Sequence, residues 1–219
     1  QGRHRKGPFI DSDDGFFFEV KENYGPEMVT AFIRLNGMTV GCVANRTEVL
    51  DEENEKTAEY EPVLGARGCD KAAEFVSFCD AFNIPVLALV NVKGYKQSKC
   101  TERRIAKAAG RLTYAFANAD VPKVTVVIGE AYGSAYVTMN SKSIGADIVY
   151  AWPDAKIGMM DAAAAVKIMY AEEISASDKA AALISEKAAE YEALQSSAAA
   201  AAGRGYVDDI IKQTRRDSA

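Results

Sequence analysis

The chain has 219 residues, a formal net charge of −5, a sequence pI near 5.1 and 48% hydrophobic residues. The hydrophobic share is ordinary for a globular protein with a core, and it excludes a wholly disordered chain. The acidic balance argues against a nucleic-acid partner. No apolar run reaches membrane-spanning length and no charged-then-apolar signal peptide opens the sequence, so we expect a cytoplasmic protein with no membrane partner.

Histidine and cysteine limit the chemistry that the chain can carry. His4 is the only histidine, and it lies in residues 1–13, which we expect to be a flexible tail. A Ser–His or Cys–His nucleophile and a histidine-ligated metal are therefore excluded from the body of the chain. No short paired spacing of the zinc or redox type joins the cysteines, which we expect to be reduced thiols: Cys42, Cys69, Cys79 and Cys100.

Two strand-like runs near the start predict a β-hairpin. Residues 28–35 and 38–44 are rich in apolar and β-branched side chains, and Asn36-Gly37 joins them. The next segment, residues 46–63, is dense in Glu and Asp and has no apolar period. It predicts a solvated loop rather than a carboxylate metal site.

Two helices follow at regular intervals. Apolar residues recur at a helical period over residues 70–82, and Asn83 ends that helix. A second helix is expected over about 105–116, where apolar side chains again share one face. Between the two helices, residues 93–102 predict a polar loop.

Strands alternate with these helices. Apolar, β-branched runs predict buried strands at 86–92 and 124–128, and shorter strands near 144–153 and 156–160. Strands that alternate with helices indicate an α/β fold.

The segment 123–138 organises this pattern. Gly129 interrupts the strand, and the turn at residues 132–135 opens onto a helix expected from Tyr136 to Lys142. A buried strand that ends at a helix start leaves backbone N–H groups without partners, and such groups bind a resting anion or a transition-state oxyanion. The residues alone leave open whether the small side chains serve only to pack a tight turn.

Alanine dominates the chain from Ala162 to Ala202 and predicts one or two helices. These are either plain surface helices or an oligomer interface. After Gly203 and Gly205, a short amphipathic helix is expected.

Five segments, in this order and spacing, resemble a known family: residues 15–19, 35–41, 70–85, 121–136 and 147–153. They are similar to the carboxyl-terminal half of the carboxyltransferase (β) subunit of biotin-dependent acyl-CoA carboxylases, the propionyl-CoA and acetyl-CoA carboxylase type. The resemblance covers roughly residues 14–168, and we expect these to form the core domain. Residues 169–219 are then Ala-rich helices that make an oligomer contact.

The resemblance implies a crotonase-like fold, a spiral of β-β-α units with additional C-terminal helices. It implies the biotin-side domain of an acyl-CoA carboxyltransferase, which moves a carboxyl group from carboxybiotin to the α-carbon of acetyl-CoA or propionyl-CoA through a thioester enolate. The expected partners are an N-terminal carboxyltransferase domain, a biotin carboxyl carrier protein, a biotin carboxylase and further copies of the chain. Proton transfer belongs to the cofactor, and the protein supplies position and oxyanion stabilisation.

The family's Gly-Gly-Ala-Tyr turn donates backbone N–H groups to the biotin ureido oxygen. Here that turn is Gly133-Ser134-Ala135-Tyr136, so the resemblance gives the donor role to Ser134 and Ala135. It assigns cofactor binding to Gly133, Tyr136, Gly94 and Tyr95, and acyl-chain choice to Val137. No metal is implied.

The chain departs from the family's motifs at several positions: Asn91, Lys93, Ser98, Ser134 and Asp161. Asn91 to Tyr95 replace an Asp-x-Pro-Gly-Phe loop, and Ser98 and Ser134 replace glycines. A glycine lost where φ is positive carries a cost. A carboxylate at Asp161 would repel negative charge near the site.

These departures keep three alternatives open. The chain is a structural subunit that has lost the biotin pocket, or a biotin-dependent acyl-CoA decarboxylase that runs the reverse reaction. The third is another crotonase-type chemistry, such as thioester hydrolysis or hydration, for which Glu130 or Glu102 would be the base.

Overall fold

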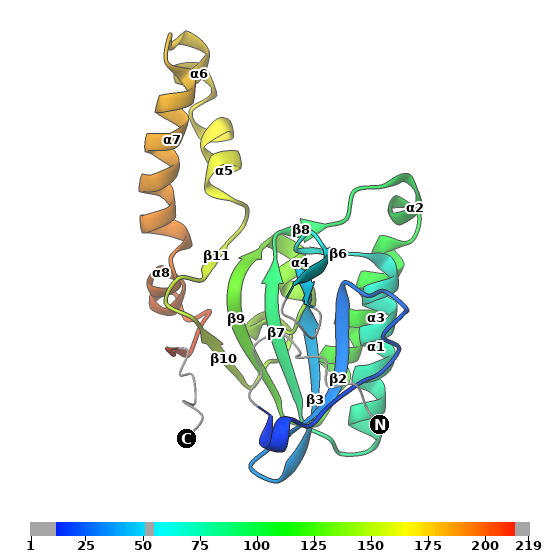
Figure 1. Ribbon diagram of the computed structural model, residues 1–219. Helices are drawn as coiled ribbons and strands as arrows, with labels where there is room; N and C mark the ends of the chain where they lie inside the picture. The colour runs from blue at the N-terminus through cyan, green and yellow to red at the C-terminus, as the bar shows by residue number, and fades with distance from the viewer. Residues whose placement is uncertain (1–11, 51–54, 213–219) are drawn as a thin grey trace.

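The computed structural model describes residues 12–50 and 55–212, which form a main sheet with helices on one face, two small two-stranded sheets and a helical arm (Figure 1). The predicted tail falls almost wholly outside these residues. Its last two members are hydrogen-bonded to the hairpin: Ser12 Oγ accepts from Arg34 N at 2.9 Å, and Asp13 Oδ2 accepts from Gly37 N at 2.7 Å.

The main sheet confirms the α/β prediction. Its strands run in the order β1-β2-β3-β7-β9-β10-β12, and β11 pairs with the far end of β9. Every pair from β3 onward is parallel. The strands are β1 Phe17–Glu19, β2 Met28–Leu35, β3 Met38–Asn45, β7 Val86–Val92, β9 Lys123–Tyr132, β10 Ile148–Ala151, β11 Lys156–Gly158 and β12 Asp209–Ile210.

The predicted hairpin is confirmed. β2 and β3 pair antiparallel from Met28↔Asn45 to Leu35↔Met38. Asn36 and Gly37 have φ values of 50° and 78°, and this pair of positive φ angles matches the twist of the two strands.

Two long helices, α1 Ala66–Ala81 and α3 Ile105–Asn118, pack against each other and cover one face of the sheet. Both were predicted, and Asn83 after α1 has the positive φ of 55° expected at a helix end. α1 begins at Ala66 instead of Asp70. Its first turn has no apolar stripe in the sequence, yet most of it is buried. Gly68 allows the helix to pack closely on Met28, because a Cβ added at position 68 would lie only 3.0 Å from the Met28 Cβ.

The largest core lies between the sheet and these helices and includes the fully buried Leu112 and Phe116. Alternate residues of β2 and β3 form a second cluster on the opposite face of the sheet. Its buried members are Val29, Ala31, Ile33, Val40, Cys42, Ala44 and Leu89.

The prediction of a solvated loop over 46–63 is wrong. β4 Glu48–Leu50 and β5 Lys56–Glu59 pair antiparallel, and β6 Val63–Leu64 pairs parallel with β8 Gly94–Tyr95 in the predicted polar loop. α2 Lys99–Glu102 follows β8. Backbone hydrogen bonds hold these strands together, and charged side chains do not prevent such bonds. The strands therefore need no apolar alternation, and the sequence shows none.

The Ala-rich region forms more helices than predicted: α5 Ala162–Met169, α6 Ala171–Ala176, α7 Ala180–Tyr191, a π-helical turn Glu192–Ser196 and α8 Ala198–Gly203. We call α5, α6 and α7 the arm, because they stand away from the sheet in Figure 1. α5 crosses the expected boundary between residues 168 and 169. No helix in the described ranges is long and apolar enough to cross a membrane.

The predicted helix after Gly205 is wrong, because this segment returns to the sheet. α8 packs on the core through Ala198 and Ala201. β12 pairs with β10. Just before β12, Asp208 accepts a hydrogen bond from Val149 N at 2.8 Å and forms an ion pair with Lys142 at 2.7 Å. Strand pairing thus satisfies the backbone that a helix would have satisfied.

We expect Phe116→Ala to lower the free energy of unfolding by about 3–5 kcal/mol, because it empties the buried space between α3 and the sheet. Tyr114→Ala removes a largely exposed ring from the same helix and should change it by about 0.5 kcal/mol at most. Urea unfolding measures both. Equal losses would contradict the placement of α3.

Candidate functional site

The central strand β9 ends where the short helix α4 Gly133–Thr138 begins. The prediction that Gly129 interrupts the strand is wrong, because β9 continues to Tyr132. Its pairing with β7 shifts between Val90↔Val127 and Val92↔Ala131, so an irregularity occurs where the sequence has Gly129. α4 is also shorter than the predicted helix and ends at Thr138.

The start of α4 depends on Gly133. Its φ is +59°, a conformation that L side chains rarely adopt, and an added Cβ would lie 3.0 Å from the carbonyl oxygen of Met159. No side chain caps the helix at Tyr132. The first-turn N–H groups, including those of Ser134 and Ala135, have no acceptor within the helix.

The glycine replaced by Ser134 carries no conformational cost in this structure. Ser134 is not among the residues with positive φ, and its side chain is exposed. Ala135 is buried. The serine therefore leaves the backbone donors of the turn in place.

The fold brings the two predicted binding segments together. The Tyr95 hydroxyl in β8 lies 3.2 Å from the carbonyl oxygen of Ser134, and α4 lies beside β8 in Figure 1. Gly94 and Val137 are both half-buried on these neighbouring elements. Two predicted binding segments, 39 residues apart in the sequence, are thus in contact in the fold.

Tyr136 is buried in α4, and burial raises the pKa of its hydroxyl to about 12. The phenol therefore stays neutral at physiological pH. Its oxygen has no hydrogen-bond partner among the described residues.

Thr138 is a site residue that the sequence did not reveal. Its Oγ1 donates to Ser134 O at 3.0 Å and lies 2.9 Å from the Tyr95 hydroxyl. Its position four residues after Ser134 is a signal, because a helical threonine can bond to that carbonyl. The contact with Tyr95 depends on the tertiary fold.

Asn91 has a structural role in place of the family's aspartate. Its Oδ1 accepts a hydrogen bond from Glu130 N at 3.0 Å, and Asn45 Oδ1 lies 3.4 Å from Asn91 N. An added Cβ at Gly129 would lie 2.7 Å from the same Oδ1, so the glycine makes room for this amide.

Two other departures are also satisfied locally. Ser98 caps α2 by accepting from Thr101 N at 3.2 Å. Lys93 is exposed, and its backbone N–H donates to Pro62 O at 2.8 Å.

Asp161 caps α5 by accepting from Ala164 N at 3.0 Å. Burial, followed by the charges of Glu130, Glu192 and Asp161, raises the pKa of the Tyr132 hydroxyl above its usual range. The predicted repulsion of negative charge by Asp161 at the turn itself stays a prediction.

Neither candidate base is joined to the turn. Glu130 is half-buried in β9, where its backbone N–H bonds to Asn91. Glu102 is exposed in α2, far from α4 in Figure 1. In the ranges that the structure describes, no group of three or more His, Cys, Asp or Glu side chains is placed to hold a metal ion.

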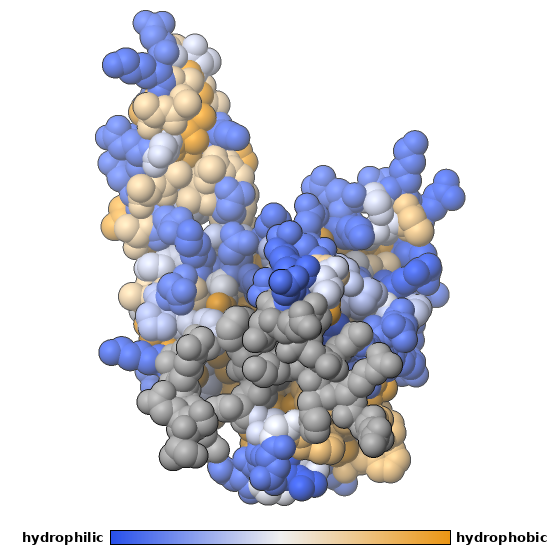
Figure 2. All heavy atoms as spheres, in the orientation of Figure 1, coloured by the Kyte–Doolittle hydropathy of each residue, from blue (hydrophilic) through white to orange (hydrophobic). Residues whose placement is uncertain are grey.

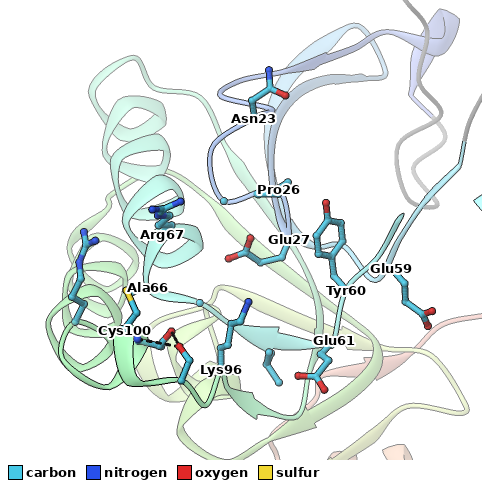
Figure 3. Close-up of a pocket in the computed structure, with 16 residues that line it drawn as sticks. Asn23, Pro26, Glu27, Glu59, Tyr60, Glu61, Ala66, Arg67, Lys96 and Cys100 are labelled. Atoms are coloured by element: carbon cyan, nitrogen blue, oxygen red, sulfur yellow. Dashed lines mark hydrogen bonds between the residues drawn. The ribbon is translucent and has the colours of Figure 1, made fainter. Parts of the chain in front are cut away.

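A hollow of about 600 Å³ lies near Lys96, α2 and the start of α1 (Figure 3). It contains no residue of α4. Glu27 lies against the α1 N-terminus, where a Cβ at Gly65 would be 2.5 Å from its Oε1. The charged lining residues are Glu27, Glu59, Glu61, Arg67, Lys96 and Arg104.

In this mostly parallel sheet, β9 leads into α4 at Gly133, and the start of α4 lies beside β8. The resemblance implied this meeting of the turn at residues 133–136 with Gly94 and Tyr95. Residues 10–218 match the family of the Carboxyl transferase domain. The chain belongs to this carboxyl transferase family.

Two curated relatives are similar over nearly the whole chain. The methylmalonyl-CoA carboxyltransferase 12S subunit of Propionibacterium freudenreichii subsp. shermanii is 42% identical over 207 residues, 93% of this chain and 38% of that subunit. The propionyl-CoA carboxylase beta chain of Cereibacter sphaeroides is 40% identical over 208 residues, 94% of this chain and 38% of that chain. The chain therefore spans about 38% of the length of these relatives.

The solved structure of transcarboxylase 12S superposes with a TM-score of 0.81 at 40% identity and covers 92% of this chain and 37% of that one. It is described as a hexamer assembly with methylmalonyl-coenzyme A and methylmalonic acid bound. The predicted family and its crotonase-like fold are confirmed.

We expect Gly133→Ala to destabilise the protein by about 1–2 kcal/mol or more, because an L side chain at φ +59° is strained and also approaches Met159 O. Gly110→Ala is the matched control, since its Cβ would meet nothing within 4 Å in the middle of α3. That change should leave stability unchanged or raise it by up to about 1 kcal/mol. Denaturant midpoints compare the two, and a neutral Gly133→Ala would contradict the turn geometry.

Proposed function

We propose that the chain is the biotin-side domain of an acyl-CoA carboxyltransferase and transfers a carboxyl group between biotin and a short acyl-CoA, acetyl-CoA or propionyl-CoA. The observation that carries the proposal is the start of α4, where Gly133 presents the unpaired N–H groups of Ser134 and Ala135 next to Tyr95. It acts with an N-terminal carboxyltransferase domain, a biotin carboxyl carrier protein and a biotin carboxylase. Its free cysteines fit a reducing, cytoplasmic setting.

The residues present fit a biotin ureido group. That group has one strongly polar acceptor oxygen, and the turn offers backbone donors that need no side chain to match it. When bound, biotin supplies the carboxyl group, and its ureido nitrogen takes the α-proton of the thioester. The chain's own residues bind and orient: Ser134 N–H and Ala135 N–H donate to the ureido oxygen, and Gly133, Gly94, Tyr95 and Tyr136 shape the site.

This proposal requires no acid or base from the described residues around the turn. Glu130 and Glu102 are not joined to the turn, and the Tyr136 phenol remains protonated at neutral pH. The protein therefore stabilises developing negative charge through preorganised backbone dipoles. The acyl-CoA is bound mainly by the N-terminal domain, and Val137 at the edge of α4 contributes to acyl-chain choice.

The arm and the segments directly before and after it support an oligomer contact. Met159, Ile168, Met169 and Leu194 are between 62% and 76% exposed, and Figure 2 shows apolar residues over much of the arm. Apolar surface of this kind marks an interaction site. We expect further copies of the chain to cover it, as in the hexamer described for transcarboxylase 12S.

One observation favours a second candidate, a structural subunit that has lost catalysis. Burial raises the pKa of the Tyr132 hydroxyl, and the carboxylates of Glu130, Glu192 and Asp161 raise it further. Tyr132 directly precedes the turn, so these carboxylates oppose negative charge near that hydroxyl. The reverse reaction, acyl-CoA decarboxylation, uses the same donors and would show the same structure.

The test is carboxyl transfer run backwards. Methylmalonyl-CoA and malonyl-CoA are each mixed with biocytin, this chain and a matching N-terminal half, and CO2 loss is measured. We expect turnover that requires both proteins and biocytin. Ala135→Pro, which deletes one donor N–H, should lower it by about 100-fold or more.

Ala162→Pro is the matched control for that variant. Ala162 is the first residue of α5, where proline is tolerated, and the preceding Asp161 is already extended at ψ 152°. Its turnover should equal that of the wild type. No turnover and no biocytin binding in a well-formed wild-type complex would favour the structural subunit.

A further inference from the structure

Two hydroxyl groups reach the carbonyl oxygen of Ser134, and a third hydroxyl bonds to one of them. Thr138, at the end of α4, donates from Oγ1 to this oxygen at 3.0 Å. Tyr95 in β8 lies 2.9 Å from Thr138 Oγ1 and 3.2 Å from Ser134 O. Thr113 in α3 lies 3.4 Å from Thr138 Oγ1 and donates to it. We call Tyr95, Thr113 and Thr138 the hydroxyl cluster.

The protons of this cluster can all be placed. Each hydroxyl has one proton and can accept from two donors. With Thr113 donating to Thr138 and Thr138 donating to Ser134 O, the Tyr95 proton goes to Thr138 Oγ1 or to Ser134 O. Thr138 is buried, so bulk water does not compete strongly for its hydrogen bonds.

The Ser134 carbonyl and the Ala135 N–H belong to one planar peptide unit. Groups that fix the carbonyl therefore fix the direction of the N–H. Hydrogen bonds accepted by the carbonyl also polarise the N–H and strengthen it as a donor. The geometry points to Thr138, assisted by Tyr95, as a positioning residue that aims the Ala135 N–H at the ureido oxygen. This inference rests on the proposed function.

An ordinary bond from a helical threonine to the carbonyl four residues earlier would not by itself carry this inference. The second hydroxyl does, because Tyr95 comes from β8, in the other predicted binding segment.

The experiment compares Thr138→Val, which keeps the shape and loses the hydroxyl, with Thr138→Ser, which keeps the hydroxyl. Removing a whole oxyanion donor costs about 10²–10³ in kcat, so we expect misdirection of one donor to cost about 10-fold. In the assembled protein, Thr138→Val should lower kcat for biocytin-dependent decarboxylation by this factor and leave KM for the acyl-CoA within about 2-fold. Thr138→Ser should restore kcat, and Tyr95→Phe should show a smaller loss.

Thr57→Val is the control for loss of a threonine hydroxyl, because the exposed Thr57 donates from Oγ1 to Val49 O at 3.1 Å in the β4–β5 pair, outside the hydroxyl cluster. It should not change kcat. Equal kcat for Thr138→Val and Thr138→Ser would overturn the inference. If Thr138→Val fails to fold, Tyr95→Phe still tests it, since Thr138 is then intact, and an unchanged kcat would count against the cluster.

A second readout does not depend on activity. Carbonyl ¹³C labelling of serine with ¹⁵N labelling of alanine selects the Ser-Ala peptide bonds, among them Ser134–Ala135. We expect the Ser134 carbonyl and Ala135 amide resonances to shift in Thr138→Val and to return in Thr138→Ser. A wild type without turnover or biocytin binding would defeat the proposed function alone. Resonances that are identical in all variants would defeat the positioning role.

Discussion

The structure depends on the way in which β9 passes the end of β7. Two residue steps along β7, from Val90 to Val92, correspond to four steps along β9, from Val127 to Ala131. The Asn91 side chain fills the resulting gap: its Oδ1 binds Glu130 N and occupies the space that a Cβ at Gly129 would need. Because a backbone N–H that loses its ladder partner must find another, this amide allows β9 to continue to Tyr132 and to start α4 at the sheet's edge.

A site built from backbone donors tolerates side-chain change. Ser134 replaces a glycine without a positive φ, whereas Gly133 carries the strained conformation and the close approach to Met159 O. Burial raises the pKa of the Tyr132 hydroxyl beside the turn, and the charges of Glu130, Glu192 and Asp161 raise it further. These carboxylates are the feature that opposes the proposed binding of negative charge near the turn.

The sequence predicted those elements whose signals are local. Asn36-Gly37 predicted the hairpin, and the apolar periods predicted α1 and α3. Among these elements, the one large boundary error is the start of α1, which lies four residues before the predicted start. It missed β4 and β5, a local pair whose acidic residues carry no apolar alternation. It also missed elements that long-range pairing creates: β12 in place of a helix, and β9 beyond Gly129. In the site, the turn 133–136 followed from small residues and resemblance. Thr138 could not follow, because its contact with Tyr95 exists only once β8 lies on α4.

The central claim is that the Ser134 and Ala135 N–H groups bind the ureido oxygen of biotin. A structure of the assembled protein with biocytin bound tests it most directly. The account predicts that oxygen about 3 Å from both nitrogens, with Tyr95 Oη still on Ser134 O. Biocytin bound elsewhere, for example in the hollow beside Lys96, or no bound biocytin at saturating concentration, would contradict the account.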